Sequence, residues 1–117
     1  MDAQNLLRPQ VITGSGTGAD TPQTGFLDGR ARAIVFIGAL SAGTTFAAKI
    51  EHADDDGVWA DLPGAVFAPL TSPNTGTDLA LDGRAAKKFV RLSYTATGGT
   101  PNLVACAFFV GFRSRNN

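Results

Sequence analysis

The sequence has few of the residues from which catalytic and metal sites are usually assembled. It contains one cysteine, one histidine and one tryptophan among 117 residues. A single cysteine excludes an internal disulfide and a multi-cysteine metal cluster, and one histidine excludes a site built from several imidazoles of one chain. A Ser-His-Asp triad would have to use His52, and no G-x-S-x-G motif is present. We therefore expect a structural or surface histidine, and the composition shows no visible active site.

Net charge and long apolar runs are also missing. Ten basic residues balance ten acidic ones, and charged residues make up only 17% of the chain. No whole-molecule field is available to attract nucleic acid or an anionic membrane. No run approaches the roughly 20 apolar residues of a membrane span, and the N-terminal MDAQNLLRPQ lacks a secretion pattern. We expect a protein made in the cytoplasm that binds neither nucleic acid nor membrane and meets its partners through shape and local contacts.

Sustained helical periodicity with caps is absent, and the chain shows many short extended segments instead. Hydrophobic residues make up 44% of the sequence, interrupted by 14 glycines and 6 prolines. Short strands at roughly 8 to 12 residue spacing are typical of a sandwich or jelly roll. The sequence predicts an all-β fold, an antiparallel, jelly-roll-like β-sandwich over residues 31–117. Residues 1–30 are predicted to be an extended N-terminal arm and loop of the same single domain.

Four segments carry most of the strand signal. Residues 32–39, RAIVFIGA, are apolar on both sides of a period-2 pattern, as in a strand covered on both faces. In residues 45–53 apolar and charged positions alternate, which predicts a half-buried strand with Phe46, Ala48 and Ile50 inside. Residues 87–96 predict a strand with Val90, Leu92 and Tyr94 on one side, and residues 103–112, LVACAFFVGF, are the strongest core candidate.

The remaining segments are weaker. PGAVFAPL, residues 63–70, predicts another short strand, and TSPNTGTD, residues 71–78, is a loop by composition. The pentapeptide LDGRA occurs at residues 27–31 and 81–85, and each copy is followed by a strand, a Gly-containing turn and a second strand. Asp-Gly favours a turn. We interpret the two copies as two similarly built hairpins in preference to a duplicated unit.

Three features of the sequence could in principle carry chemistry. Residues 14–19, GSGTGA, fit the dinucleotide pattern G-x-G-x-x-G/A, but the following DTPQTG excludes the required helix, so we predict a flexible loop. The turn of Asp54, Asp55 and Asp56 lacks the spacing of an EF-hand, and a looser calcium site in it stays open. Cys106 lies within an apolar run, where we expect an inert core residue.

The stretch from Arg32 to Gly64, with AIVFIGAL, SAGTT and FAAKIEHADDDGVWADLPGA, resembles the head-decoration or cement proteins of tailed bacteriophages and prophages. KKFVRLSYTATGGT followed by an apolar strand adds to this resemblance. The resemblance implies a jelly-roll-like sandwich in the virion, made in the host bacterial cytoplasm, that binds the capsid surface. It implies the major capsid protein as partner, bridging of its subunits, and a homo-oligomer, either a dimer or a trimer. It implies no enzyme activity, no cofactor and no catalytic residue.

Candidate partner-binding residues lie at the two ends of the chain. We expect residues 1–13 to form an arm that becomes ordered across a neighbour, so that its apolar side chains are buried only in the assembled state. These candidates are Leu6, Leu7, Val11 and Ile12, together with Arg113 and Arg115 in the C-terminal FRSRNN.

The alternative function is a carbohydrate-binding β-sandwich module on a phage tail or particle surface. Its candidate contacts are Trp59 and Tyr94, as stacking platforms for a sugar ring, and the turn from Asp54 to Asp56.

Overall fold

The computed structural model describes residues 2–18, 21–22, 30–82, 87, 89–98 and 100–111, and every regular element in them is a β-strand. The all-β prediction is confirmed. The strands are β1 (Asp2–Ile12), β2 (Gly16–Thr17), β3 (Thr21–Pro22), β4 (Arg30–Leu40), β5 (Thr45–Ala53), β6 (Ala60–Val66), β7 (Thr75–Asp82), β8 (Phe89–Thr97) and β9 (Leu103–Gly111).

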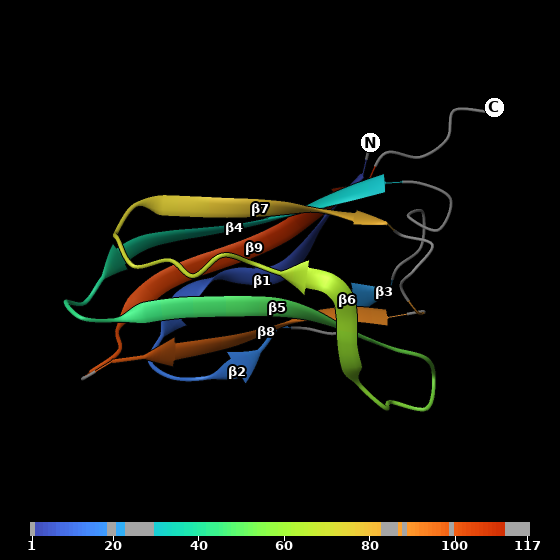
Figure 1. The fold of residues 1–117 in the computed structure, drawn as a ribbon, viewed down its shortest axis with the longest axis horizontal. Helices are drawn as coiled ribbons and strands as arrows, with labels where there is room; N and C mark the ends of the chain where they lie inside the picture. The colour runs from blue at the N-terminus through green and yellow to red at the C-terminus, as the bar shows by residue number, and fades with distance from the viewer. Residues whose placement is uncertain are drawn as a thin grey trace.

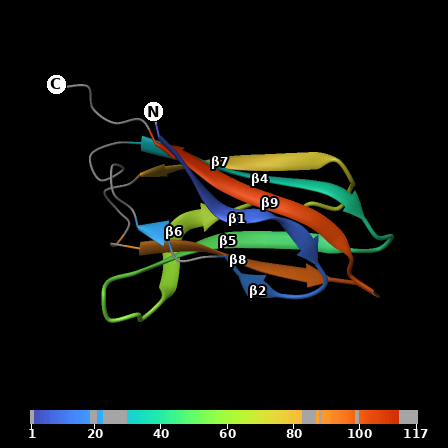
Figure 2. The ribbon, with the colours of Figure 1, turned by 180° about the vertical axis from the view of Figure 1, so that it is seen from behind.

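The strands form two antiparallel sheets packed face to face. Sheet A has the order β1-β9-β4-β7, and sheet B has the order β2-β8-β5-β6, with the short β3 also pairing with β8. Figure 1 shows β7 at the border of sheet A. Seen from behind, β1 and β9 cross in front of β5 and β8 (Figure 2). The prediction of an antiparallel β-sandwich is therefore confirmed.

The turns that were expected to close hairpins connect the two sheets instead. β4 lies in sheet A and β5 in sheet B, and likewise β8 lies in sheet B and β9 in sheet A. The long-range partners are β4 with β9 and β5 with β8. The hairpin interpretation of the repeat is wrong, because a Gly-containing turn between two alternating strands serves a hairpin and an arch between sheets equally well.

The two arches contact each other at one end of the sandwich. The Ser41 N–H donates to the carbonyl of Asn102 at 2.9 Å, and the Asn102 N–H donates to Ser41 Oγ at 3.0 Å. The hydroxyls of Ser41 and Thr44 are 2.6 Å apart. Gly98, at φ 126°, packs so closely on the carbonyl of Gly43 that a Cβ there would collide with it. These contacts fix the two sheets relative to each other.

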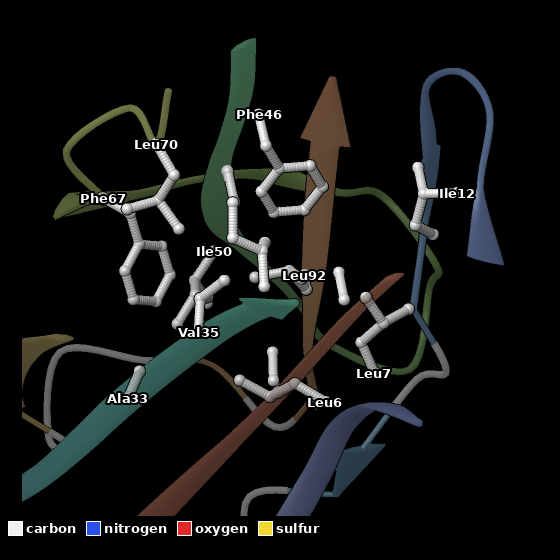
Figure 3. Packing of buried hydrophobic residues seen from close by; sticks show 14 of the residues in the cluster. Leu6, Leu7, Ile12, Ala33, Val35, Phe46, Ile50, Phe67, Leu70 and Leu92 are labelled. Carbon is white, nitrogen blue, oxygen red and sulfur yellow. The ribbon is translucent and has the colours of Figure 1, made fainter. Parts of the chain in front are cut away.

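The core lies between the sheets and draws on both (Figure 3). Full burial of a large apolar side chain stabilises a fold by roughly 1.5–3 kcal/mol, so this interior supplies the main driving force. The largest fully buried side chains are Phe46, Leu6, Ile50, Leu92, Leu103 and Val35. The predicted inward residues of β5 and β8 are confirmed, except that Tyr94 is only partly buried.

The strand β7 is not where the sequence placed one. Thr75 to Asp78 were expected in a loop, but they pair with β4 in an unbroken register that runs from Ile37↔Thr75 to Arg30↔Asp82. Glycine and aspartate are depleted in strands, and the segment has no apolar residue to mark an inward face, so its two threonines alone give little strand signal. The ladder with β4 holds this segment in place. The paired residues of β4 and β7 lie far apart in the sequence, as in Ile37↔Thr75 and Arg30↔Asp82.

The first strand is part of the sandwich. β1 is extended, as expected, but it pairs with β9 from Asp2↔Gly111 to Ile12↔Leu103. Leu6 and Leu7 are 0% and 3% exposed and belong to the core of this chain. The expectation that these side chains are buried only on assembly is therefore wrong. Leu6, Leu7 and Ile12 of β1 therefore complete the core between the two sheets.

In the described part of the chain, no helix has the length and apolar character needed to cross a bilayer.

Candidate functional site

The side of sheet A that faces away from the core carries a band of apolar side chains. Ala33, Val35 and Ile37 of β4 point inward and are buried, so their neighbours along the strand point outward. The same alternation in β9 sends every second residue outward. We call this outward-facing set the apolar face: Val11, Ile34, Phe36, Val104, Cys106 and Phe108.

The members of the apolar face are cross-strand neighbours and form one continuous surface. Val11 pairs with Val104, Phe36 with Cys106, and Ile34 with Phe108. The rings of Phe36 and Phe108 have centroids 6.1 Å apart and are tilted by 31°. The band therefore runs across β1, β9 and β4.

Three members of the apolar face are large and well exposed. Val11 is 61% exposed, Phe36 47% and Val104 41%. Single exposed apolar residues are ordinary, whereas a contiguous exposed apolar patch marks an interaction site in many proteins. The sequence predicted that residues 32–39 are covered on both faces, but this chain covers only one. The outer side of this strand is therefore left partly exposed.

Gly76 of β7 makes room for the ring of Phe36. A Cβ on Gly76 would lie 2.6 Å from Cδ1 of Phe36 and 2.9 Å from the carbonyl oxygen of Val35. The absent side chain lets the ring lie across the edge strand, which widens the apolar face toward β7.

The charged groups at the border of the apolar face neutralise each other. Arg32 Nη1 donates to Asp78 Oδ2 at 2.9 Å, and the two side chains are 51% and 50% exposed. Burying an unpaired charge is costly. Because Arg32 and Asp78 are paired with each other, a molecule that covered this region would bury no unpaired charge from this ion pair.

Cys106 was expected in the core but faces outward. It is half-buried on the apolar face, opposite Phe36. Its neighbours Ala105 and Ala107 point inward in its place. An apolar run such as residues 103–112 has no polar positions to reveal which alternate set turns inward.

The outer face of sheet B is different in kind, because ion pairs cross its strands. Arg91 Nε donates to Glu51 Oε1 at 2.8 Å, and Lys49 Nζ lies 2.8 Å from Asp61 Oδ1. The hydrogen bond from Lys49 to Asp61 raises the pKa of this lysine above its usual value. The guanidinium of Arg91 also lies 4.2 Å from the ring centroid of Trp59. We call these five residues the charged face.

A shallow open groove of about 260 Å³ lies beside the charged face. It is lined by Ala47, Ala48, Lys49, Val66, Ser93 and Thr95. Small side chains form its floor, while an ammonium group and two hydroxyls offer hydrogen bonds.

The residues expected to grip sugar do not come together. Arg91 occupies one side of the Trp59 ring. Tyr94 stacks on the core residue Phe46, with ring centroids 5.8 Å apart. The turn at Asp54 is closed by a backbone bond from Gly57 N–H at 3.2 Å, and Asp56 Oδ1 accepts from the N–H of Val58 at 3.0 Å. Across the described residues, no group of three or more acidic, histidine or cysteine side chains is arranged to hold a metal ion.

His52 has a structural role at the end of β5. It is 8% exposed, and its Nδ1 accepts a hydrogen bond from the backbone N–H of Lys87 at 3.1 Å. Burial lowers the pKa of this imidazole, and the charge of Lys87 lowers it further. The neutral form is therefore favoured in the folded protein, as expected for a structural histidine.

The Gly-rich motif is built into the sandwich. Gly16 and Thr17 form β2 on the edge of sheet B, and Gly16 leaves room for the Tyr94 hydroxyl. Gly18 donates its N–H to the carbonyl of Leu92 at 2.8 Å and packs against the backbone of Leu6. The prediction of a flexible loop is wrong over residues 16–18, because these close contacts explain the glycines.

The predicted partner-binding residues lie in different environments. Leu6, Leu7 and Ile12 are buried in the core, so they are not available to a partner. Val11 is exposed and joins the apolar face, where partner binding stays a prediction. Arg113 and Arg115 lie outside the described residues. The sequence did not single out Phe36, Val104 and Phe108, although apolar residues on both sides of one strand were the available signal.

Comparison with known proteins establishes the fold and no family. No protein-family model matches the chain, and no curated protein is significantly similar to it. The SPBc2 prophage-derived protein YomS aligns with a TM-score of 0.50 and 13% identity, over 94% of this chain and 92% of that chain.

Two larger chains share the fold as well. A structure of infectious bursal disease virus, Gx strain, gives a TM-score of 0.56 at 8% identity, over 98% of this chain and 32% of that chain. The CBM22-1-GH10 modules of Clostridium thermocellum xylanase 10B, complexed with xylohexaose, give 0.52 at 14% identity, over 94% and 26%. The protein thus spans about a third and a quarter of these two chains.

Proposed function

We propose that the protein is a non-enzymatic virion structural protein that binds the outside of a phage capsid and stabilises it by bridging major capsid protein subunits. The observation that carries this proposal is the apolar face. Phe36 and Val104 are exposed on a rigid sheet whose other side is already buried in the protein's own core. Covering them with a capsid subunit would remove apolar area from water.

The rest of the molecule suits a mechanical role. The chain has no net charge, and Arg32 and Asp78 at the border of the apolar face neutralise each other. Contact through this face is then governed by shape and apolar burial rather than by long-range attraction. Many copies on one shell would add weak contacts into firm attachment through avidity.

The comparisons are compatible with this proposal. The fold is shared with a prophage-derived protein of nearly the same length and with a viral protein. A β-sandwich serves many functions, so the proposal depends on the apolar face and on the resemblance in residues 32–64.

The test is binding to undecorated capsids. Phe36→Lys and Val104→Lys each place a charge in the apolar face, and we expect each to weaken binding at least roughly tenfold, the effect of losing an interface hot spot. The matched control is Val66→Lys, since Val66 is 68% exposed on β6 of sheet B. Cosedimentation of labelled protein with shells measures the affinity. Equal binding by all four proteins would refute the proposed contact.

Carbohydrate binding is the second candidate, and the groove beside the charged face favours it. Hydroxyl and ammonium groups of Ser93, Thr95 and Lys49 line the groove, and the fold is shared with a chain solved with xylohexaose. A glycan array is the test. Sugar binding that is lost in Ser93→Val and retained in Phe36→Lys would support this candidate over the capsid contact.

A further inference from the structure

The sandwich has exposed sheet edges, and those other than β7 carry proline, a register shift or very short strands, features that discourage pairing with another strand. β7 has none of these three, and the charge of Asp78 on it is paired with Arg32. β1 contains Pro9 and has two register shifts against β9. β6 contains Pro63 and Gly64 and has a register shift against β5. β2 and β3 have only two residues each. Proline, bulges and shortness are the devices by which natural proteins blunt sheet edges.

β7 is the exception. It runs for eight residues from Thr75 to Asp82 without proline, without lysine and without a register shift. Among the described strands it pairs with β4 alone, and no described residue outside β4 pairs with the backbone groups of its other edge. It lies at the border of the molecule in Figure 1. Leu79 packs only partly against the core, which leaves apolar area at this edge.

We propose that β7 pairs antiparallel with β7 of a second copy about a twofold axis at Leu79, which joins the two A sheets into one. This inference is independent of the proposed function. A twofold antiparallel pair must be centred on a residue for opposite side chains to share a face. The two registers that keep most of β7 paired are centred on Asp78 and on Leu79.

The charges select between these two registers. The register centred on Asp78 places this carboxylate opposite its own copy, and like charges directly opposite are destabilising. The register centred on Leu79 places Asp78 opposite Ala80 of the second copy. Because Ala80 in turn pairs with Arg32 of β4, each Asp78 then lies in line with a basic residue of the other subunit.

The packing agrees with the register centred on Leu79. The two Leu79 side chains face each other on the inner side and would close the core of each sandwich at this edge. On the outer side the junction carries the Arg32–Asp78 pairs of the two copies, between their apolar faces.

Disulfide trapping tests the geometry in a Cys106→Ala background, which leaves no other cysteine. Residues directly opposite in an antiparallel pair have Cα atoms about 4.5–5.5 Å apart, which a disulfide can span. Leu79→Cys should therefore form a covalent dimer under mild oxidation. Ala80→Cys is the matched control, because its opposite residue is Asp78 and the two copies of position 80 are offset along the strands. Cross-linking of Ala80→Cys but not Leu79→Cys would overturn the proposal.

A charge pair at Ala80 keeps the test independent of any damage at Leu79. Ala80→Lys should tighten the dimer and Ala80→Asp should weaken it, each roughly two- to tenfold, because each change acts twice against Asp78 of the other copy. Within the monomer the signs are reversed, since Ala80 pairs with Arg32. Sedimentation velocity across a concentration series measures the dimer constant. A protein that stays monomeric throughout, or a dimer insensitive to both changes, would refute the pairing.

Discussion

Sheets A and B present similar faces to the core and unlike faces to the solvent. Val35 of β4 and Ile50 of β5 are both 1% exposed and meet across the interior (Figure 3). Outside, sheet A shows the apolar face, whereas sheet B shows ion pairs and hydroxyls. On sheet B the charges of Arg91 and Glu51 are paired within the chain. On sheet A the side chains of Phe36 and Val104 expose apolar area to water. This difference is the reason why we propose sheet A as the interacting side of the molecule.

Truncating one buried and one exposed phenylalanine tests this difference with the largest expected effect. Phe46 is 1% exposed between the sheets, so Phe46→Ala should lower the free energy of unfolding by about 3–5 kcal/mol. Phe36→Ala should lower it by about 1 kcal/mol or less, because the ring is half exposed and loses mainly its contact with Phe108. Urea denaturation measures both. Equal losses would mean that Phe36 serves the fold of the monomer rather than a partner.

The ion pairs of the two faces give a second and smaller contrast. The side chains of Arg91 and Glu51 are 23% and 16% exposed, and Arg91 also covers Trp59. Arg91→Ala should cost about 1–2 kcal/mol of stability and shift the emission of the single tryptophan to the red as water reaches the ring.

Arg32→Ala is the matched control on sheet A. Its pair with Asp78 is half exposed, so the loss should be about 0–0.5 kcal/mol with unchanged fluorescence. A cost for Arg32→Ala as large as that for Arg91→Ala would contradict the contrast between the two faces.

The smallest effect is a pH dependence that belongs to sheet B. His52 is a buried titratable side chain, and its pKa is lowered below the ordinary 6.5. Above pH 6.5 the imidazole is neutral in the folded and unfolded states, so its contribution is fully present. As pH falls below 6.5 the unfolded chain takes up a proton more readily, and stability is lost.

Urea midpoints at pH 7.5 and 5.0 measure this loss, and His52→Gln should make it smaller. An identical loss in the variant would assign the acid sensitivity to other groups.

Local pattern was sufficient for much of the fold. The alternation in residues 45–53 and 87–96 predicted which side chains of β5 and β8 turn inward, because a half-buried strand imposes a period of two. The same reasoning failed for β7, since Gly76 and Asp78 are of types depleted in strands, residues 75–78 contain no apolar residue, and the strand depends on a ladder with distant β4. It failed for the repeat as well, because hairpins and arches use the same turn residues.

The candidate site divides in the same way. Apolar residues on both sides of residues 32–39 predicted a strand, which the structure confirms, and cover on both faces, of which this chain provides only the inner one. The sequence could not indicate that Leu6 and Leu7 are buried in the core, because two adjacent apolar residues near the start of a chain are compatible with an extended arm and with a core strand.

The sequence by itself determined an all-β chain without the residues for a multi-cysteine or multi-histidine site, since composition and period-2 alternation are local properties. Only the tertiary structure decided which sheet each strand joins, which apolar positions are covered and which edge stays open. Those outcomes follow from pairing between distant segments such as β1 with β9 and β4 with β7, and neither ladder is encoded by the residues next to it.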